Sequence, residues 1–180
     1  MTDTHQVLLG AIRYERGVDV NRMLRAIADQ LRTRGIATAG VVQHNQAPEK
    51  GYNAQMNLID LRTGSAVAIS QDLGPHAQGC RLDQSRLLEA AGIIGAAIEA
   101  GSDLIIINRF GKAEAEGEGL LSSITEAIIA RVPVLTTVRP PYLEAWHKFH
   151  GGLATELPPS EPAVLDWCET AMGRSPRPNA

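Results

Sequence analysis

The chain has 180 residues, of which 44% are hydrophobic and 21% are charged, a composition typical of one globular domain with its own core. Aromatic residues make up only 4%, so we expect a core of Leu, Ile, Val and Ala. The formal net charge of −3 argues against a nucleic-acid-binding protein that relies on overall positive charge. An anion-binding site would therefore have to be local.

Cysteine usage and hydropathy exclude further classes of protein. Cys80 and Cys168 are far apart and form no Cys-x-x-Cys motif, so we expect neither a zinc site nor a disulfide framework. No apolar run approaches the roughly 20 residues that span a membrane. The first residues, MTDTHQVLLGAI, lead into a strand without a basic segment or a cleavage signal. We expect a cytoplasmic protein with no membrane partner, and leave a homo-oligomer open.

The first part of the chain alternates apolar strands with one amphipathic helix. Asp19 is placed to cap that helix and Gly35 to end it. Arg-Thr-Gly-Ser is typical of the turn of an antiparallel hairpin. The expected elements are a strand over 6–12, a helix over 19–34, a strand over 36–43, and hairpin strands over 54–61 and 66–70.

The second part continues the alternation of strands and helices. The expected elements are a helix over 83–100, a strand over 104–107, a helix over 120–130, a strand over 132–138, a helix over 142–149, an edge strand over 153–157 and a helix over 161–172. This pattern predicts an α/β protein with three layers and a mostly parallel sheet carrying an inserted antiparallel hairpin. We expect one domain over 1–173 and a disordered tail over 174–180.

The stretch SDLIIINRFGKAEAEGEG, residues 102–119, places polar side chains directly after a buried strand. A β-rich apolar run of this kind is typical of a central parallel strand. Ligands of open α/β sheets bind at the carboxyl ends of such strands. The sequence therefore predicts a binding site after the strand over 104–107.

Four segments carry a resemblance to a known group of proteins. They are LRTRGIATAGVV, LIDLRTGSAVAIS, CRLDQSRLLEAAGIIGAAIEAGSDLIIINRFGKAE and VPVLTTVRP. From about residue 6 to residue 150 the chain resembles the small P-loop nucleoside-triphosphatases of the THEP type. Within that group it is more similar to a bacterial family of unknown function that carries Asn-[Lys/Arg]-Phe-Gly-Lys-x-Glu-x-x-Gly and an upstream Cys-Arg-Leu-Asp. That resemblance implies a P-loop-NTPase-like fold and genes that often lie near molybdate-transport genes.

The chain departs from the triphosphatases at both motifs that handle nucleotide. A P-loop needs Gly-x-x-x-x-Gly-Lys-[Ser/Thr], but the matching stretch is GAIRYERGVDVN, in which Asp19 would occupy the helix amides and repel phosphate. The Asp-Glu pair that the resemblance implies at the end of the central strand is replaced by Asn108 and Arg109, while Gly111, Lys112 and Glu114 match. Metal-assisted hydrolysis is therefore not expected.

Hydrogen-bond donors and cations follow several of the predicted strands. We expect no catalytic residue and no metal ligand, and the ligand-binding candidates are Arg13, Arg16, Gln43, Cys80, Arg81, Asn108, Arg109, Gly111, Lys112, Glu114 and Arg139. Arg and Lys suit a tetrahedral oxyanion or a phosphate. The first hypothesis is a non-hydrolytic protein that binds a small anionic ligand, either an oxyanion such as molybdate or tungstate or a nucleotide, in molybdenum homeostasis.

Several of these side chains have plainer alternatives. Arg13, Arg16 and Arg139 could be solvated loop charges. The acidic residues 114, 116 and 118 could form a solvated loop, with Glu114 pairing with Lys112 or Arg109. Cys80 could be a small buried hydrophobe rather than a nucleophile.

One pair of histidines raises the question of a metal. His147 and His150 are three residues apart and could share a helix face. No third ligand is evident nearby, so the sequence does not predict a metal site there.

Two other functions stay open at this stage. The first is an enzyme, either a nucleoside-triphosphatase that uses Lys112 and Arg109 in place of the lost groups or a transferase acting on a nucleotide-like molybdenum cofactor. The second is a protein-binding adaptor that presents the polar loop over 44–53 and the Pro140-Pro141 segment to a partner.

Overall fold

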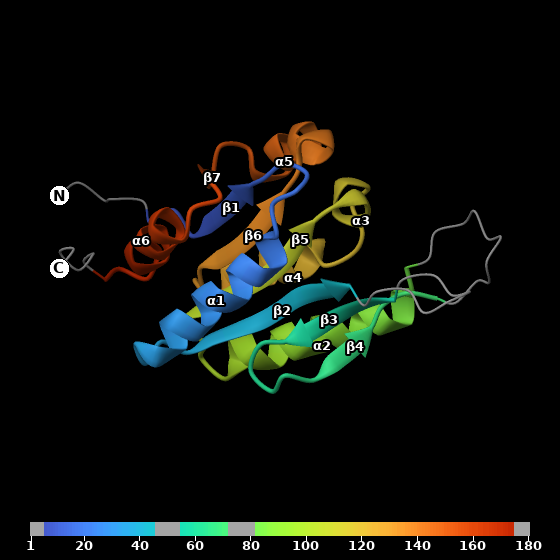
Figure 1. Cartoon of the computed structure of the whole chain (residues 1–180), viewed down its shortest axis with the longest axis horizontal. Helices are drawn as coiled ribbons and strands as arrows, with labels where there is room; N and C mark the ends of the chain where they lie inside the picture. The colour runs from blue at the N-terminus through green and yellow to red at the C-terminus, as the bar shows by residue number, and fades with distance from the viewer. Residues whose placement is uncertain (1–5, 46–54, 72–81, 175–180) are drawn as a thin grey trace.

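The computed structural model describes residues 6–45, 55–71 and 82–174. Within them, seven strands form one sheet in the order β4-β3-β2-β5-β6-β1-β7 (Figure 1). The strands are β1 (Leu9–Arg13), β2 (Thr38–Asn45), β3 (Met56–Asp60), β4 (Ala66–Ala68), β5 (Leu104–Phe110), β6 (Val134–Val138) and β7 (Ala154–Leu157). The helices are α1 (Val20–Thr33), α2 (Gln84–Glu99), α3 (Lys112–Ala115), α4 (Leu121–Ile129), α5 (Leu143–His150) and α6 (Glu161–Ala171), with a 3₁₀ turn η1 (Pro140–Tyr142) before α5.

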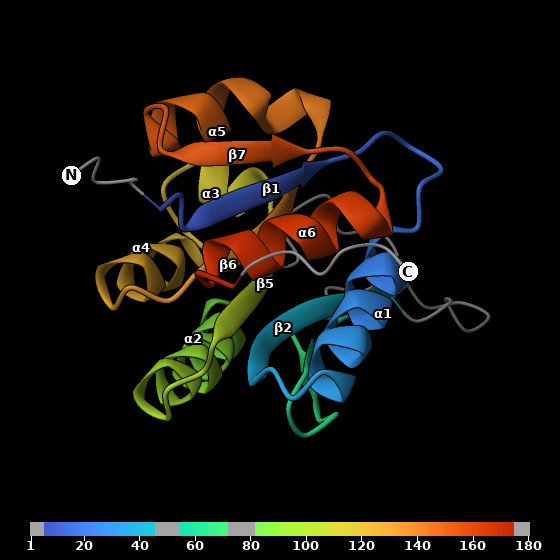
Figure 2. The ribbon, with the colours of Figure 1, turned by 90° about the vertical axis from the view of Figure 1, so that its left-hand side faces the viewer.

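The sheet is mostly parallel. β2, β5, β6, β1 and β7 pair in parallel, and β3 and β4 add an antiparallel hairpin to the edge of β2. Figure 2 shows β7 and β1 at the end of the sheet opposite β2. The predicted α/β fold with an inserted hairpin is confirmed.

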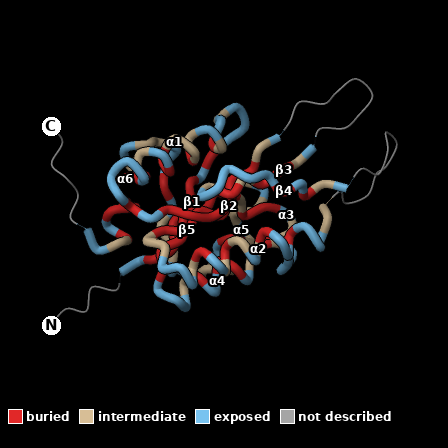
Figure 3. The backbone as a smooth tube through the Cα atoms, turned by 90° about the horizontal axis from the view of Figure 1, so that it is seen from below, coloured by how far each residue is buried: buried red, intermediate tan, exposed pale blue. Residues whose placement is uncertain are grey.

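Helices cover both faces of the sheet, giving three layers. α1 and α6 lie on one face, and α2 and α4 lie on the other (Figure 3). Successive β5 residues serve the two faces in turn, because Ile105 and Ile107 belong to the α2–α4 core whereas Leu104 and Ile106 belong to the α1–α6 core. A strand buried on both faces reads as the continuous apolar run that the sequence displays.

Local signals set the bounds of α1 and bring β2 close to β5. The Asp19 side chain accepts a hydrogen bond from the Arg22 N–H at 3.0 Å, and Gly35 ends the helix with a φ of 74°. Gly40 has a φ of 119°, and a Cβ there would collide with the backbone of Ile106. Glycine is therefore required where these two strands approach.

The central strand is longer than predicted. β5 continues beyond Ile107 through Asn108 to Phe110, with its pairing to β6 shifted between Ile107 and Phe110. Phe110 is buried against Trp146 of α5, with ring centroids 5.2 Å apart. The polar pair of residues 108 and 109 therefore interrupts the apolar pattern without ending the strand. None of the described helices is both long and apolar enough to cross a membrane.

Candidate functional site

Two cavities lie at the carboxyl edge of the sheet, and both are lined by Arg109 of β5. The first, here called the arginine pocket, has a volume of about 220 Å³. It lies between the β1–α1 loop and the ends of β5 and β6. Its lining residues are Tyr14, Glu15, Arg16, Gly17, Val18, Asp19, Val20, Asn21, Arg109 and Arg139.

Three arginines from separate segments line the arginine pocket. Arg16 is exposed, whereas Arg109 and Arg139 are half-buried. Among the described residues, none of the three guanidinium groups forms an ion pair. The Nε of Arg139 is buried and has no hydrogen-bond partner within the described part of the chain. Since buried polar groups are normally paired, Arg139 brings an unsatisfied donor to the lining of this pocket.

Two carboxylates also line the arginine pocket, and only one of them is engaged with the main chain there. Asp19 caps α1 through the Arg22 N–H, and Glu15 is exposed. The capping that the sequence predicts is thus present, and it occupies a helix amide that a working P-loop would offer to phosphate. The loop itself is tied to β6 by the Tyr14 N–H, which donates to the Val138 carbonyl at 3.2 Å.

Asn108 is the centre of a buried side-chain network beside this pocket. Its amide donates to Asn21 Oδ1 at 2.6 Å, and its Oδ1 accepts from the Thr137 hydroxyl at 2.7 Å. The side chain is 1% exposed. The network joins β5 to α1 and β6, so Asn108 acts first as a structural link.

Glu114 differs from the expectation of a solvated acidic loop. It is only 9% exposed. Its Oε2 accepts from the Gly111 N–H at 3.0 Å and its Oε1 from the Leu120 N–H at 2.9 Å. Both oxygens therefore satisfy buried main-chain donors, and the pairing with Lys112 or Arg109 is not formed. Lys112 instead lies 3.9 Å from Glu116, with its side chain 70% exposed.

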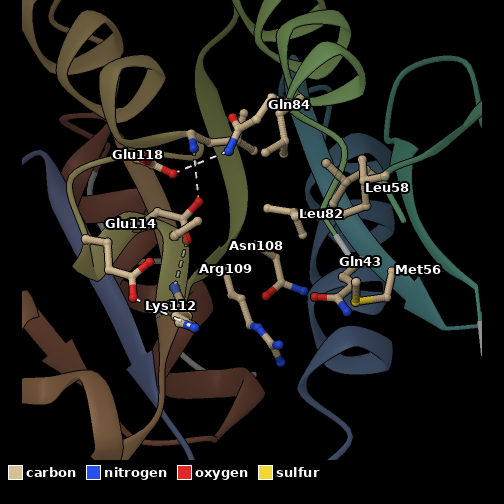
Figure 4. A pocket seen from close by; sticks show the side chains of 16 residues that line it. Gln43, Met56, Leu58, Leu82, Gln84, Asn108, Arg109, Lys112, Glu114 and Glu118 are labelled. Atoms are coloured by element: carbon tan, nitrogen blue, oxygen red, sulfur yellow. Dashed lines mark hydrogen bonds and ion pairs between the residues drawn. The ribbon is translucent and has the colours of Figure 1, made fainter. Parts of the chain in front are cut away.

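The second cavity, here called the hairpin pocket, has a volume of about 240 Å³. It lies between the β3–β4 hairpin, the start of α2 and the segment after β5. Figure 4 shows Gln43 and Met56 on one side, Glu114 and Lys112 on the other, and Asn108 and Arg109 between them. The lining residues are Gln43, Met56, Leu58, Ile69, Leu82, Gln84, Leu87, Asn108, Arg109, Gly111, Lys112, Ala113, Glu114, Glu116, Glu118 and Leu120.

The structure divides the predicted site residues among three places. Arg16, Arg109 and Arg139 meet at the arginine pocket, and Gln43, Asn108, Gly111, Lys112 and Glu114 join Arg109 at the hairpin pocket. Arg13 lines a separate cavity beside Glu156. Cys80 and Arg81 lie outside the described residues.

Sequence reasoning missed residues of two kinds. Asn21 and Thr137 carried no local signal, because their partner Asn108 is distant in the chain. The apolar residues of the hairpin pocket, such as Met56 and Leu82, read as ordinary core. One signal was available for them: the hairpin was expected to follow the strand that carries Gln43, which indicated that hairpin residues could lie near this predicted site residue.

Cys168, His147 and His150, which the structure describes, have structural surroundings. Burial raises the pKa of the Cys168 thiol to about 12, with the nearby Glu169 adding to the shift, so the reactive thiolate is suppressed. His147 pairs with Glu156, and His150 Nδ1 accepts from the Gly152 N–H at 3.0 Å. Within the three described ranges, no three His, Cys, Asp or Glu side chains could hold a metal ion together.

Two comparisons relate the chain to other proteins. A human cancer-related nucleoside triphosphatase solved in solution matches 82% of this chain and 86% of its own, with a TM-score of 0.61 and 14% identity, which confirms a P-loop-NTPase-like fold. The molybdenum import ATP-binding protein ModC 2 of Bradyrhizobium diazoefficiens is 37% identical over 169 residues. That match takes in 94% of this chain but only 19% of the relative, so the chain spans about a fifth of its length.

A family match extends over most of the chain. Residues 9–167 match the family described as "Protein of unknown function (DUF2478)". The range includes the sheet from β1 to β7 and both pockets. The resemblance to a bacterial family related to P-loop nucleoside-triphosphatases is thereby confirmed, and the chain belongs to the DUF2478 family.

Proposed function

We propose that this protein binds a small oxyanion of the molybdate or tungstate type in the arginine pocket and does not hydrolyse nucleotides. The observation that carries the proposal is the approach of Arg16, Arg109 and Arg139 to one small cavity, with a buried and unpartnered Nε on Arg139. Guanidinium groups donate pairs of hydrogen bonds in a fixed plane and hold carboxylates and phosphate-like oxyanions well.

Size favours an oxyanion over a whole nucleotide in this pocket. Its volume is about 220 Å³, whereas pockets for drug-sized ligands have about 300–1,000 Å³. The carboxylates of Glu15 and Asp19 reduce the positive charge but do not cancel it, since three cations face two anions. A compact dianion gains more from this arrangement than a neutral ligand does.

The arrangement of groups supports binding without hydrolysis. Asn108 stands where the related triphosphatases have the acid that assists Mg²⁺, and its amide is already engaged by Asn21 and Thr137. Lys112 is exposed beside Glu116, which gives no support to an NTPase that relies on this lysine. Asp19 takes a main-chain donor at the start of α1.

Molybdenum is the preferred element because of the relative's name. The long bacterial relative is a molybdenum import ATP-binding protein, and a stretch of it is similar to nearly all of this chain. We therefore place the proposed oxyanion binding in molybdenum homeostasis, where a soluble binder could deliver or sense the imported anion.

Isothermal titration with molybdate, tungstate, sulfate and ATP tests the proposal. Molybdate or tungstate is expected to bind, and Arg139→Ala is expected to weaken binding about tenfold, because a charged hydrogen bond contributes about 1.5–3 kcal/mol and 1.4 kcal/mol is tenfold. Arg62→Ala is the matched control, because Arg62 is exposed on the hairpin turn and lines neither pocket.

Two results would count against the proposed function. One is the absence of heat with every oxyanion up to about 1 mM, which as a dissociation constant corresponds to only about −4 kcal/mol of binding free energy. The other is an equal loss of binding in Arg139→Ala and Arg62→Ala. Phosphate release from ATP with Mg²⁺, abolished by Lys112→Ala, would instead favour the cryptic triphosphatase.

A further inference from the structure

We infer that the hairpin pocket is a second binding site, which takes a planar heteroaromatic ring carrying an anionic substituent. This inference goes beyond the oxyanion site. It uses a different cavity and shares only Arg109 with the arginine pocket.

The cavity has the size and the apolar floor that a ring needs. Six large apolar side chains line it, from β3, from the residue after β4, from the residues before and within the first turn of α2, and from the residue before α4: Met56, Leu58, Ile69, Leu82, Leu87 and Leu120. Leu58, Ile69, Leu87 and Leu120 are buried, which makes the floor part of the core. A dry cavity of about 150 Å³ admits benzene, so about 240 Å³ has room for one or two fused rings, whereas the sugar of a nucleotide would lie outside the cavity.

Carboxamide groups at the rim suit the edge of a heterocycle. Gln43 donates to Asn45 Oδ1 at 2.7 Å and is 6% exposed, so its side chain is held in place near the end of β2. Gln84 donates to Glu118 at 3.3 Å across the mouth of the cavity. A carboxamide has two donor hydrogens and an oxygen that accepts. These two groups therefore keep capacity to pair with ring nitrogens and exocyclic oxygens.

The lining of the hairpin pocket carries three glutamates against Arg109 and Lys112, so an anionic substituent is favoured only where it meets Arg109. Each of the three glutamates that line it already has a partner: Glu114 holds two main-chain amides, Glu116 lies by Lys112, and Glu118 accepts from Gln84. Arg109 forms no ion pair with any described residue. A phosphate or carboxylate on the ring ligand would reach Arg109 at the wall between the two pockets.

This shared arginine couples the two sites. A ring ligand whose anion occupies Arg109 competes with molybdate for that guanidinium, so each should weaken the binding of the other. A neutral ring lacks this contact and should not compete. Mutual weakening of ring-anion and molybdate binding is therefore expected, and an apolar cavity without Arg109 would not produce it.

Titrations with whole and half ligands identify the chemistry. The probes are adenosine monophosphate and pterin carboxylate as ring anions, adenosine as a ring alone, and ribose phosphate as an anion alone. One of the two ring anions is expected to bind at least about tenfold more tightly than either half ligand, since a charged hydrogen bond is lost with the anion. The adenine and pterin arms distinguish a nucleotide from a pterin source.

Three variants locate the binding site. Met56→Trp fills the half-buried edge of the hairpin pocket and is expected to abolish ring-anion binding while leaving molybdate titration unchanged. Gln84→Ala removes an exposed rim amide with little risk to folding and should weaken binding several-fold. Leu88→Trp is the matched control, because Leu88 is 74% exposed on α2 and lies outside the cavity.

The outcomes separate this inference from the proposed function. Equal ring-anion affinity in Met56→Trp, Gln84→Ala and Leu88→Trp would overturn the hairpin site, as would the absence of binding by either ring anion at about 1 mM. Adenosine binding as tightly as its monophosphate would overturn the role of Arg109. Molybdate binding that persists in every one of these cases leaves the arginine pocket intact, and ring binding without molybdate binding leaves only the hairpin site.

Discussion

Two loops at the carboxyl edge of the sheet are held in different ways. The segment after β5, residues 111–120, folds around the buried Glu114 carboxylate, whose two oxygens accept from the Gly111 and Leu120 amides. The segment after β1, residues 14–19, is held by the Tyr14 amide, by a main-chain hydrogen bond from the Val18 N–H to the Glu15 carbonyl at 3.4 Å and by the Asp19 cap, and the Glu15 and Arg16 side chains are exposed. In the first loop a buried side chain holds the main chain. In the second loop the charged side chains line the arginine pocket.

The loop that matches the related triphosphatases in sequence is not the loop that lines the arginine pocket. Gly111 and Glu114 match the related triphosphatases, and in the structure the Glu114 carboxylate accepts from the Gly111 N–H and so holds the loop. Arg16 lies in the loop that has lost the P-loop pattern, and it lines the arginine pocket. The loop that matches the triphosphatase motif is thus held by its own carboxylate, while the loop without the P-loop pattern supplies an arginine to the proposed binding site.

Removal of the Glu114 carboxylate is the strongest test of how the loop after β5 is held. Glu114→Ala leaves the Gly111 and Leu120 amides without acceptors, and we expect a loss of about 3 kcal/mol in the free energy of unfolding, since hydrogen bonds to charged groups contribute about 1.5–3 kcal/mol each. Urea denaturation measures it. The exposed Glu116→Ala is the control, with an expected change within about 0.5 kcal/mol.

A loss of ligand binding with unchanged stability in Glu114→Ala would contradict the structural role of this residue. Glu114→Gln refines the test. It keeps one acceptor oxygen and should retain about half of the stabilisation.

Substitution of Asn108 is expected to give the next largest loss of stability, because this side chain links β5 to α1 and β6. Asn108→Leu removes the partners of Asn21 and Thr137 and is expected to cost about 2 kcal/mol, within the 1–3 kcal/mol typical of an unsatisfied buried group. Molybdate affinity should change by less than about threefold, because Asn108 does not line the arginine pocket. Intact stability with lost binding would reverse the assignment.

Gly119 tests the geometry around the same carboxylate. It has a φ of 66°, and a Cβ there would collide with Glu114. We expect Gly119→Ala to cost about 1–2 kcal/mol, the penalty of the left-handed region for a residue with a side chain. In the Glu114→Ala background the collision with the Glu114 side chain is relieved. A double-mutant cycle should therefore show a loss of stability in the double mutant that is smaller than the sum of the losses in the two single mutants.

The sequence predicted the order of the elements well because burial shapes whole segments. β5 and β6 lie between two helical layers, so their residues form the apolar runs from which they were identified. The end of β5 was misjudged, since Asn108 and Arg109 look like the start of a loop. Phe110 returns to the core beyond them through its contact with Trp146.

The site could be predicted only as far as strand ends determine it. The rule that parallel strands end at one edge indicated that Arg109 and Arg139 would approach each other. The burial of Glu114 was hidden, because a run rich in Glu and Gly is typical of an exposed loop. Asn21 is 87 residues from Asn108, and such pairings depend on tertiary packing that no local pattern encodes.

The smallest expected loss of stability comes from Asp19, which both caps α1 and lines the arginine pocket. Asp19→Ala should cost about 1 kcal/mol through the lost N-cap of α1. It should also raise molybdate affinity several-fold, because a carboxylate leaves the lining of the arginine pocket and a helix amide becomes available to the anion. Asp83→Ala is the matched control, since Asp83 caps α2 in the same way but does not line the arginine pocket. A similar gain of affinity in both variants would trace the effect to net charge, whereas a gain confined to Asp19→Ala would show that this loop meets the anion directly.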